Sequence, residues 1–368
     1  MFFSPQLRMN INAVIITMIS WTLVGIFVVF YNNSLLSTPF ISLGPSQTYQ
    51  FNVQLGIWSF ISALGGLIAG SFLVLINRSV FRKKSFLYAI ITTIISYLLL
   101  FTVLMILYLG IRAYLALGEE TTLSSVFSLA LEMTTKFYPL MHFVLWCFVT
   151  LSTLFMLQVN DKFGPGILKK FLLGNYSQPQ KETRIFMFLD MKSSTTIAEK
   201  IGTEKYFYLL RNIFAHLTDT ILNHDGEIYQ YVGDEIVISW PIKKGVYKAN
   251  CIQCFLKIKS KLVELQPYYE EKYDIAPIFK AGIHHGQVMA GEVGIIKKDI
   301  IYSGDILNTA ARIQAKCNAY SVDFLISKNT LNIMNLEDLA TIEVTEIGRV
   351  LLRGKKEELL LSSIHEKV

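Results

Sequence analysis

The sequence predicts an α-helical membrane region followed by a water-soluble domain in which strands alternate with helices. The chain has 368 residues, of which 52% are hydrophobic and 17% charged, and its mean hydropathy is +0.43. This composition excludes a disordered chain and argues against an ordinary soluble protein. The charges are divided unevenly, since only ten of the Asp, Glu, Lys and Arg residues precede residue 161. The first part is therefore suited to lipid and the second to water.

Four apolar stretches, each free of Asp, Glu, Lys and Arg, are long enough to cross a bilayer core, which takes about 20 residues of helix. They are residues 11–31, 55–76, 86–110 and 139–159. The first is too long for a signal peptide and no clear cleavage site follows it, so we expect a retained helix. The spans lack paired acids and an inverted repeat, which a transporter would normally have. We interpret the region as an anchor, a dimerisation device or a sensor.

The basic residues between the spans predict the orientation. Residues 77–85 carry Arg78, Arg82, Lys83 and Lys84. Because basic loops stay on the cytoplasmic side, both termini and this loop are expected there, in a multi-pass protein of the cell's inner membrane. The net charge of +6 forms no concentrated basic face, so nucleic acid is not an expected partner. The expected domains are a four-span region at 1–160, a linker at 161–183 and a cytoplasmic domain at 184–364.

A carboxylate and a helix start open the soluble domain. Residues 184–190 form a buried, strand-like run that ends on Asp190, and a polar and then helical segment follows. Ser193 and Ser194 are candidate N-caps of this helix. The arrangement suits a metal-bound polyphosphate, because the acid can hold the cation and the free backbone N–H groups can bind phosphate oxygens.

A second carboxylate lies in a predicted hairpin. Two strand-like runs within residues 227–240 flank Val232–Glu235, which places Asp234 near the tip. A lone Gly-Asp turn is often structural. Two strands that each present an Asp, with a helix between them, are a stronger indication of a metal site, because two Asp carboxylates can hold a pair of Mg²⁺ ions.

A third element carries an amide and a guanidinium. Residues 279–294 are strand-like with glycine punctuation, and the sequence becomes helical from Gly304. Asn308 and Arg312 are four residues apart and share a helix face. Such a pair alone would indicate a solvated face. Here it follows a Gly-Asp start and adjoins an apolar helix side, which favours a functional role.

The matched segments resemble the class III nucleotidyl cyclases, the adenylate and guanylate cyclase family. The segments are FLDMKSST, YQYVGDEIV, KAGIHHGQVMAGEVG and GDILNTAARI, and the order and spacing of the last two are specific. The resemblance covers about residues 181–364. It implies a ferredoxin-like βαββαβ core that works as a head-to-tail homodimer, with each active site shared across the interface.

The resemblance also assigns the metal site. It implies that Asp190, Asp234 and the main chain of Met191 bind two Mg²⁺ or Mn²⁺ ions. Family members usually have a glycine–phenylalanine pair after the first metal Asp, whereas this chain has Ser193 and Ser194. The serines keep the helix start, so we expect them to contact the substrate and activity to be retained.

The nucleotide contacts follow from the same resemblance. Asn308 would orient the ribose, and Arg312 would stabilise charge that develops at the phosphorus. Lys355 resembles the late basic residue that contacts the triphosphate, with Arg353 as an alternative. The implied reaction is attack of the ribose 3′-hydroxyl on the α-phosphorus with loss of pyrophosphate.

Two residues are candidates for selecting the purine base. They are Lys280 and Ser303. A strict alignment would place Ile278 at the first of these positions, and Ile301 lies near the second. Side chains two residues apart share a strand face. Guanylate cyclases typically have Glu and Cys at these places, and no such pair is visible, which favours ATP. The prediction is a membrane-anchored adenylate cyclase that makes cyclic AMP.

Three alternatives remain. A guanylate cyclase would make cyclic GMP from the same site. A diguanylate cyclase would have a doubled glycine and a Phe in its hairpin, where this chain has Val232 and Ile236. A catalytically silent nucleotide-binding membrane receptor would usually have lost a metal Asp or the Arg, and Asp190, Asp234 and Arg312 are all present. The sequence does not identify a signal for the membrane region.

Overall fold

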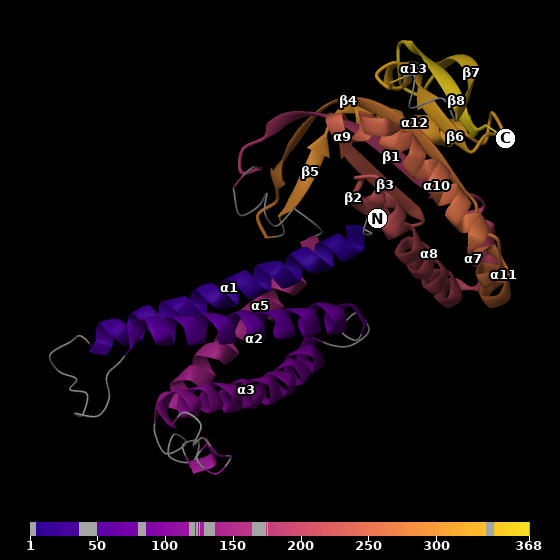
Figure 1. Ribbon diagram of the computed structural model, residues 1–368. Helices are drawn as coiled ribbons and strands as arrows, with labels where there is room; N and C mark the ends of the chain where they lie inside the picture. Colours follow the sequence, from indigo (N-terminus) through magenta and orange to yellow (C-terminus); the bar gives the residue numbers. More distant parts are fainter. Residues whose placement is uncertain are drawn as a thin grey trace. The chain divides into compact units, whose positions relative to one another are not determined.

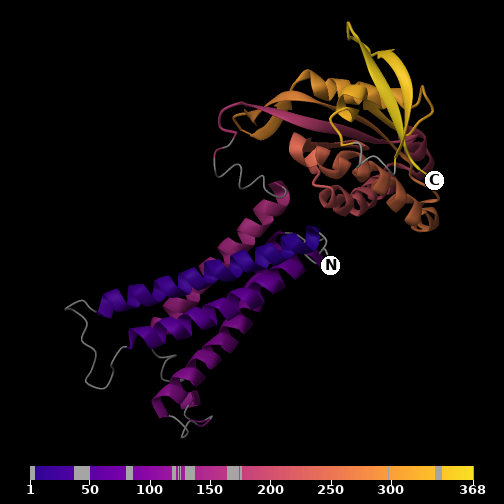
Figure 2. The ribbon, with the colours of Figure 1, turned by 45° about the horizontal axis from the view of Figure 1, so that its top comes forward.

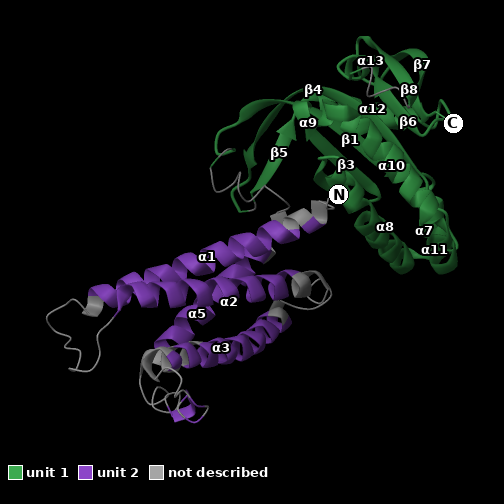
Figure 3. Cartoon of the chain, in the orientation of Figure 1, with its two compact units in different colours: residues 1–6, 170–368 green, residues 7–169 purple. Residues whose placement is uncertain are grey.

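The computed structural model describes residues 5–36, 50–79, 86–117, 122, 124, 126–128, 137–163, 174, 176–296, 298–335 and 342–367. The chain forms two compact units, residues 7–169 and residues 170–368 with 1–6 (Figures 1 and 3). The basic segment at 80–85 and the linker segment at 164–173 lie outside the described residues. The predicted orientation and the predicted linker, which depend on them, stay predictions.

Four long helices make up the first unit. They are α1 (Pro5–Leu36), α2 (Phe51–Ser79), α3 (Phe86–Leu117) and α5 (Phe137–Phe163). Three contain apolar stretches of spanning length: Asn10–Ser34, Phe51–Val74 and Ile90–Leu107. The fourth predicted span, residues 139–159, falls in α5, where the apolar stretch among the described residues, Met141–Leu157, is shorter than the other three. Three of the four predicted spans are therefore found at full length in the described part of the chain.

Glycines and aromatic rings hold these helices together. A methyl group added at Gly66 would lie 2.8 Å from the Cα of Met18, so the α1 and α2 backbones approach closely there. Gly66 and Gly70 have the small-xxx-small spacing that permits such an approach. Each helix also contributes one large buried ring. The four rings belong to Trp21, Trp58, Tyr97 and Trp146.

The second unit is built on one mixed sheet. Its strands are β1 (Gln180–Met191), β2 (Glu227–Val232), β3 (Glu235–Pro241), β4 (Phe279–Val293), β5 (Asp299–Ser303), β6 (Phe324–Ser327), β7 (Ile342–Leu351) and β8 (Glu358–Glu366). The order is β2-β3-β1-β4-β6-β8-β7, and β5 pairs with β4. The predicted strand at 184–190 thus begins four residues earlier, at Gln180.

Helices cover both faces of this sheet. They are α7 (Ser194–Ile201), α8 (Thr203–Asn223), α9 (Ile242–Val246), α10 (Asn250–Glu264), α11 (Gln266–Tyr273), α12 (Asp305–Lys316) and α13 (Lys328–Leu331). The succession β1-α8-β2-β3-α10-β4, with β1 between β3 and β4, is a ferredoxin-like βαββαβ core. This arrangement confirms the predicted fold class.

Burial on both faces explains why β1 is almost wholly apolar. Ile185, Met187 and Leu189 belong to a core shared with α8 and α10. Phe186 and Phe188 point to the opposite face and share a core with α12. The sheet therefore lies between α8 and α10 on one side and α12 on the other (Figure 2).

The contact between α12 and β4 depends on Gly282. A methyl group there would lie 2.2 Å from the backbone nitrogen of Gln314 and 2.7 Å from the carbonyl oxygen of Ala310. Backbone atoms cannot rotate aside, so Gly282→Ala should push α12 off the sheet and cost about 3 kcal/mol of unfolding free energy. The measurement is thermal unfolding of the detergent-solubilised chain. Gly56→Ala is the matched control, because its methyl would meet no atom within 4 Å; equal melting temperatures would contradict the prediction.

Candidate active site

Three carboxyl groups gather where β1 ends beside the β2–β3 turn. Asp190 is the penultimate residue of β1, and the pairing of Leu189 with Ile236 puts it next to that turn. Gly233 has φ +61°, a left-handed conformation that closes the turn and presents Asp234 and Glu235. The fold thus brings together the two Asp residues that the sequence singled out.

The electrostatics of this corner show that the acids repel one another. Burial raises the pKa of Asp190, and Asp234 raises it further. Burial, together with the charges of Asp190 and Asp234, raises the pKa of Glu235 to about 7. Tyr206 of α8 also lies near this corner, since burial and Asp234 raise the pKa of its hydroxyl. Sequence reasoning passed over Glu235 and Tyr206.

Two donors from other elements hold Asp190. The ammonium of Lys280 lies 3.2 Å from Oδ2 of Asp190, and the side chain of Lys280 is only 11% exposed. Nε2 of Gln314 donates to the same oxygen at 2.9 Å. Both donors therefore use the same carboxylate oxygen of Asp190. The amino-acid sequence alone does not indicate the contact between Lys280 and Asp190, because this contact depends on the β1–β4 register that pairs the two residues.

Two of the residues expected to bind nucleotide, Asn308 and Arg312, lie on the outer side of α12. Asn308 is exposed and Arg312 is half-buried. The guanidinium of Arg312 packs over the loop between β7 and β8, where a methyl at Gly354 would lie 3.6 Å from it. The ammonium of Lys355 in that loop is ion-paired with Asp305 and lowers the pKa of Asp305. Lys355 is therefore held at the start of α12.

The carboxylates and the α12 pair face in different directions within one chain. Gln314 points toward Asp190, as its hydrogen bond shows. Arg312 is two residues away, which is about 200° around the helix axis. The buried side of α12 consists of Ile306, Thr309, Ala310, Ile313 and Gln314. Asn308 and Arg312 thus point away from the sheet and from Asp190.

Ser193 and Ser194 differ from the sequence interpretation. Ser193 occupies the N-cap position of α7, but its side chain makes no capping hydrogen bond. Its φ of +55° is left-handed, whereas a capping side chain reaches the helix from the extended region. The predicted side-chain cap is therefore wrong at Ser193. Ser194 is the first residue of α7 and is half-buried. The left-handed backbone also accounts for the glycine that the family usually has at this place.

Lys280 and Ser303 do not form a pair within the chain. Ser303 lies opposite Met289 on β4, nine residues along the strand from Lys280. Nine residues of extended chain span about 30 Å. The ammonium of Lys280 is instead committed to Asp190. Within a single protomer, Lys280 and Ser303 are therefore too far apart to select the base together, contrary to the prediction.

The carboxylate corner fits a divalent cation. Among the described residues, no group of three or more His, Cys, Asp or Glu side chains is arranged to hold a metal alone. Mg²⁺ is usually held by one or two carboxylates together with substrate phosphates and water. Asp190 and Asp234 supply the carboxylates. A bound cation would offset the repulsion among the acids, which contributes to the raised pKa values of Asp190 and Glu235. Met191 is 1% exposed and belongs to the hydrophobic core, so its side chain is not a candidate ligand.

Known proteins resemble this chain in sequence and in fold. The family model described as the adenylate and guanylate cyclase catalytic domain matches residues 176–362. Adenylate cyclase 2 of Rhizobium meliloti (strain 1021) is 30% identical over 232 residues, which are 63% of each chain. Guanylate cyclase 2D of Rattus norvegicus is 22% identical over 204 residues, 54% of this chain and 18% of that protein. A bacterial light-regulated adenylyl cyclase superposes with a TM-score of 0.52 at 21% identity, covering 63% of this chain and 66% of that one.

The family model matches half of the chain, so these comparisons define its class. The chain belongs to the adenylate and guanylate cyclase catalytic domain family, the class III nucleotidyl cyclases. The match covers 63% of the length of Adenylate cyclase 2 and 22% of Adenylate cyclase 1 of the same organism. The likeness to the light-regulated enzyme concerns the fold.

Proposed function

We propose that the chain is a membrane-anchored adenylate cyclase that converts ATP to 3′,5′-cyclic AMP and pyrophosphate. The observation that carries the proposal is the convergence of Asp190 and Asp234 at one corner of a cyclase fold. Asn308, Arg312 and Lys355 are also present, at the outer side of α12. The 30% identity to an adenylate cyclase supports ATP as the substrate.

The residues divide the work of the reaction. Two Mg²⁺ or Mn²⁺ ions at Asp190, Asp234 and the Met191 main chain would lower the pKa of the ribose 3′-hydroxyl and neutralise the triphosphate. Asn308 would fix the ribose, so that its 3′-oxygen lies in line with the α-phosphorus. Arg312 would stabilise the charge that develops there, and Lys355 would bind the triphosphate chain. Preorganised positive charge of this kind supplies much of the reduction in barrier.

We further propose that the active site forms between two copies of the chain. Within one copy, Gln314 and Arg312 point to different sides of α12, so the carboxylates and the Asn308–Arg312 pair are separated. A two-fold dimer would bring the outer side of α12 from one protomer to the carboxylates of the other, twice. The complete enzyme is thus a homodimer with two shared sites.

The helical unit supports a membrane location. Three apolar helices of spanning length precede the cyclase domain. We infer a multi-pass protein of the inner membrane, with domains at 1–160, 161–183 and 184–364. The cyclase domain lies in the cytoplasm, where ATP is available, in agreement with the basic loop at Arg78–Lys84.

A paired assay tests the proposal. The purified full-length chain is incubated with Mn²⁺ or Mg²⁺ and either ATP or GTP, and cyclic nucleotide and pyrophosphate are quantified. We expect cyclic AMP from ATP and much less cyclic GMP from GTP. A preference for GTP would make the protein a guanylate cyclase. If neither nucleotide is cyclised, the enzyme assignment is wrong and a nucleotide-binding receptor remains.

Lys280→Met should lower the affinity of the proposed site for metal without abolishing metal binding. The substitution keeps the length of the side chain but removes the ammonium that holds Oδ2 of Asp190. Losing a group that orients a metal ligand typically costs about 10- to 100-fold in affinity or activity. We expect a drop of about tenfold in turnover or in apparent Mn²⁺ affinity, measured by metal titration of the cyclase rate. Lys259→Met is the matched control, because Lys259 pairs with Asp323 instead; equal effects of the two substitutions would contradict the prediction.

A further inference from the structure

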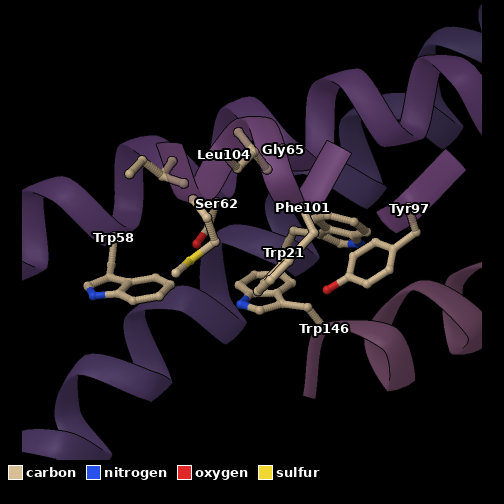
Figure 4. A pocket seen from close by; sticks show the side chains of 10 residues that line it. Trp21, Trp58, Ser62, Gly65, Tyr97, Phe101, Leu104 and Trp146 are labelled. Atoms are coloured by element: carbon tan, nitrogen blue, oxygen red, sulfur yellow. The ribbon is translucent and has the colours of Figure 1, made fainter. Parts of the chain in front are cut away.

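Two cavities lie within the helical unit and share Tyr97 of α3. The first has a volume of about 40 Å³ and is walled by the rings of Trp21, Trp58, Trp146 and Phe101, with Ser62 beside them (Figure 4). The second is larger, about 260 Å³, and is lined mainly by residues of α2 and α3. Its lining includes Ala69, Leu73, Thr93, Ser96, Tyr97 and Leu100.

Three buried hydroxyl groups at these cavities have unmet hydrogen-bonding capacity. They belong to Ser62, Thr93 and Tyr97, whose residues are only 2%, 2% and 5% exposed. None of the three finds a hydrogen-bond partner among the residues that the structure describes. Ser62 and Tyr97 point toward the aromatic rings of the first cavity (Figure 4). Buried polar groups are normally hydrogen-bonded, so groups of this kind need an explanation.

The behaviour of other threonines in the same helices sharpens the observation. A threonine in a helix commonly donates to the carbonyl four residues before it. The hydroxyls that do so belong to Thr17, Thr22, Thr92, Thr102, Thr150 and Thr153. Thr93 does not. Because Thr93 and Tyr97 are four residues apart, they lie on one face of α3, and both line the larger cavity.

We propose that these cavities form a binding site for a neutral, lipid-soluble molecule with a single ring and a carbonyl oxygen. The oxygen would accept hydrogen bonds from Tyr97 and Thr93, and the ring would pack in the space that the two cavities offer. The lining residues of both cavities carry no charge, which excludes an ionic ligand at this depth. Aromatic walls favour a flat ring over a saturated chain. A bare acyl chain would leave the hydroxyls of Tyr97 and Thr93 without partners.

Tryptophan fluorescence reports directly on this site. The chain has four tryptophans, and three of them, Trp21, Trp58 and Trp146, line the first cavity. The experiment reconstitutes the full-length chain in phosphatidylcholine vesicles and titrates it with duroquinone, a neutral single-ring dicarbonyl that quenches indole emission. We expect saturable quenching. The readout needs no cyclase activity, so its failure is separate from failure of the proposed enzyme function.

Matched variants distinguish binding from simple partition into the bilayer. Tyr97→Phe and Thr93→Val remove one donor each and should weaken duroquinone binding by about fivefold. Ala69→Leu should abolish the saturable component by filling the larger cavity. Tyr114→Phe and Thr92→Val are the controls, because Tyr114 is exposed and the hydroxyl of Thr92 bonds its own helix; both should bind as the native chain does. Quenching that rises linearly, or equal affinity in all five variants, overturns the proposal.

Discussion

Asp234→Ala is expected to reduce cyclic nucleotide formation by about a thousandfold or more, while leaving the protein folded. A metal-bound carboxylate controls several kcal/mol of transition-state stabilisation, and about 1.4 kcal/mol corresponds to each factor of ten in rate. Asp234 lies in a turn, and it interacts with Asp190, whose pKa it raises. Its removal would therefore take away a proposed metal ligand rather than a residue of the hydrophobic core.

The stability of the variant gives an independent check. Because Asp234 repels its neighbours, Asp234→Ala should leave the melting temperature unchanged or raise it. Glu264→Ala is the control for loss of a surface carboxylate, because Glu264 is exposed and forms its ion pair with Lys261; the turnover of this variant should be normal. A melting temperature that falls together with activity would instead indicate that Asp234 has a structural role.

The pH dependence of stability should also change. Folding raises the pKa of Glu235 to about 7, partly through Asp234. An acid whose pKa is raised on folding binds more protons in the folded state, so stability is lost as the pH rises from its ordinary value of 4.5 toward 7. In chelator, thermal melts at pH 5 and pH 7.5 should show a smaller loss for Asp234→Ala than for the native chain. An equal loss would mean that Asp234 does not act on Glu235.

Local patterns in the sequence were sufficient to locate the carboxylates. The apolar run before Asp190 could only be a buried strand, and the Gly-Asp step between two strand-like runs could only be a hairpin. The structure agrees on both. The ferredoxin-like order was implied by family resemblance rather than by these patterns, and it is the order observed.

Features that depend on strand register and helix packing could not be predicted from the sequence. Lys280 seemed free to read a base, because nothing in the chain shows that β1 and β4 pair it with Asp190. In the sequence, Gln314 is one of several polar residues of a helix. Its side chain faces the sheet because Ala310 and Gln314 pack on Gly282. The backbone of Ser193 was equally hidden, because a serine after a strand ordinarily caps in the extended conformation. Each of these features arises from tertiary contacts.

Mixing two inactive variants should restore activity if the site is shared between chains. Asp234→Ala and Arg312→Ala are each expected to be nearly inactive alone. In a heterodimer of the two, one site combines both defects, and the other combines the intact carboxylates of one chain with the intact Arg312 of its partner. Random pairing makes half of the dimers heterodimers, each with one good site, so about a quarter of native activity should return.

The geometry of α12 makes this a decisive experiment. Gln314 ties one side of the helix to Asp190 of the same chain, so Arg312 cannot reach that corner without turning the helix by about half a revolution. A control mixture of Asp190→Ala and Asp234→Ala must stay inactive, because both residues come from the same chain and neither site is repaired. Recovery in the first mixture and none in the control supports the shared site. If neither mixture recovers while both variants still dimerise, the site lies within one chain and α12 must rotate during catalysis.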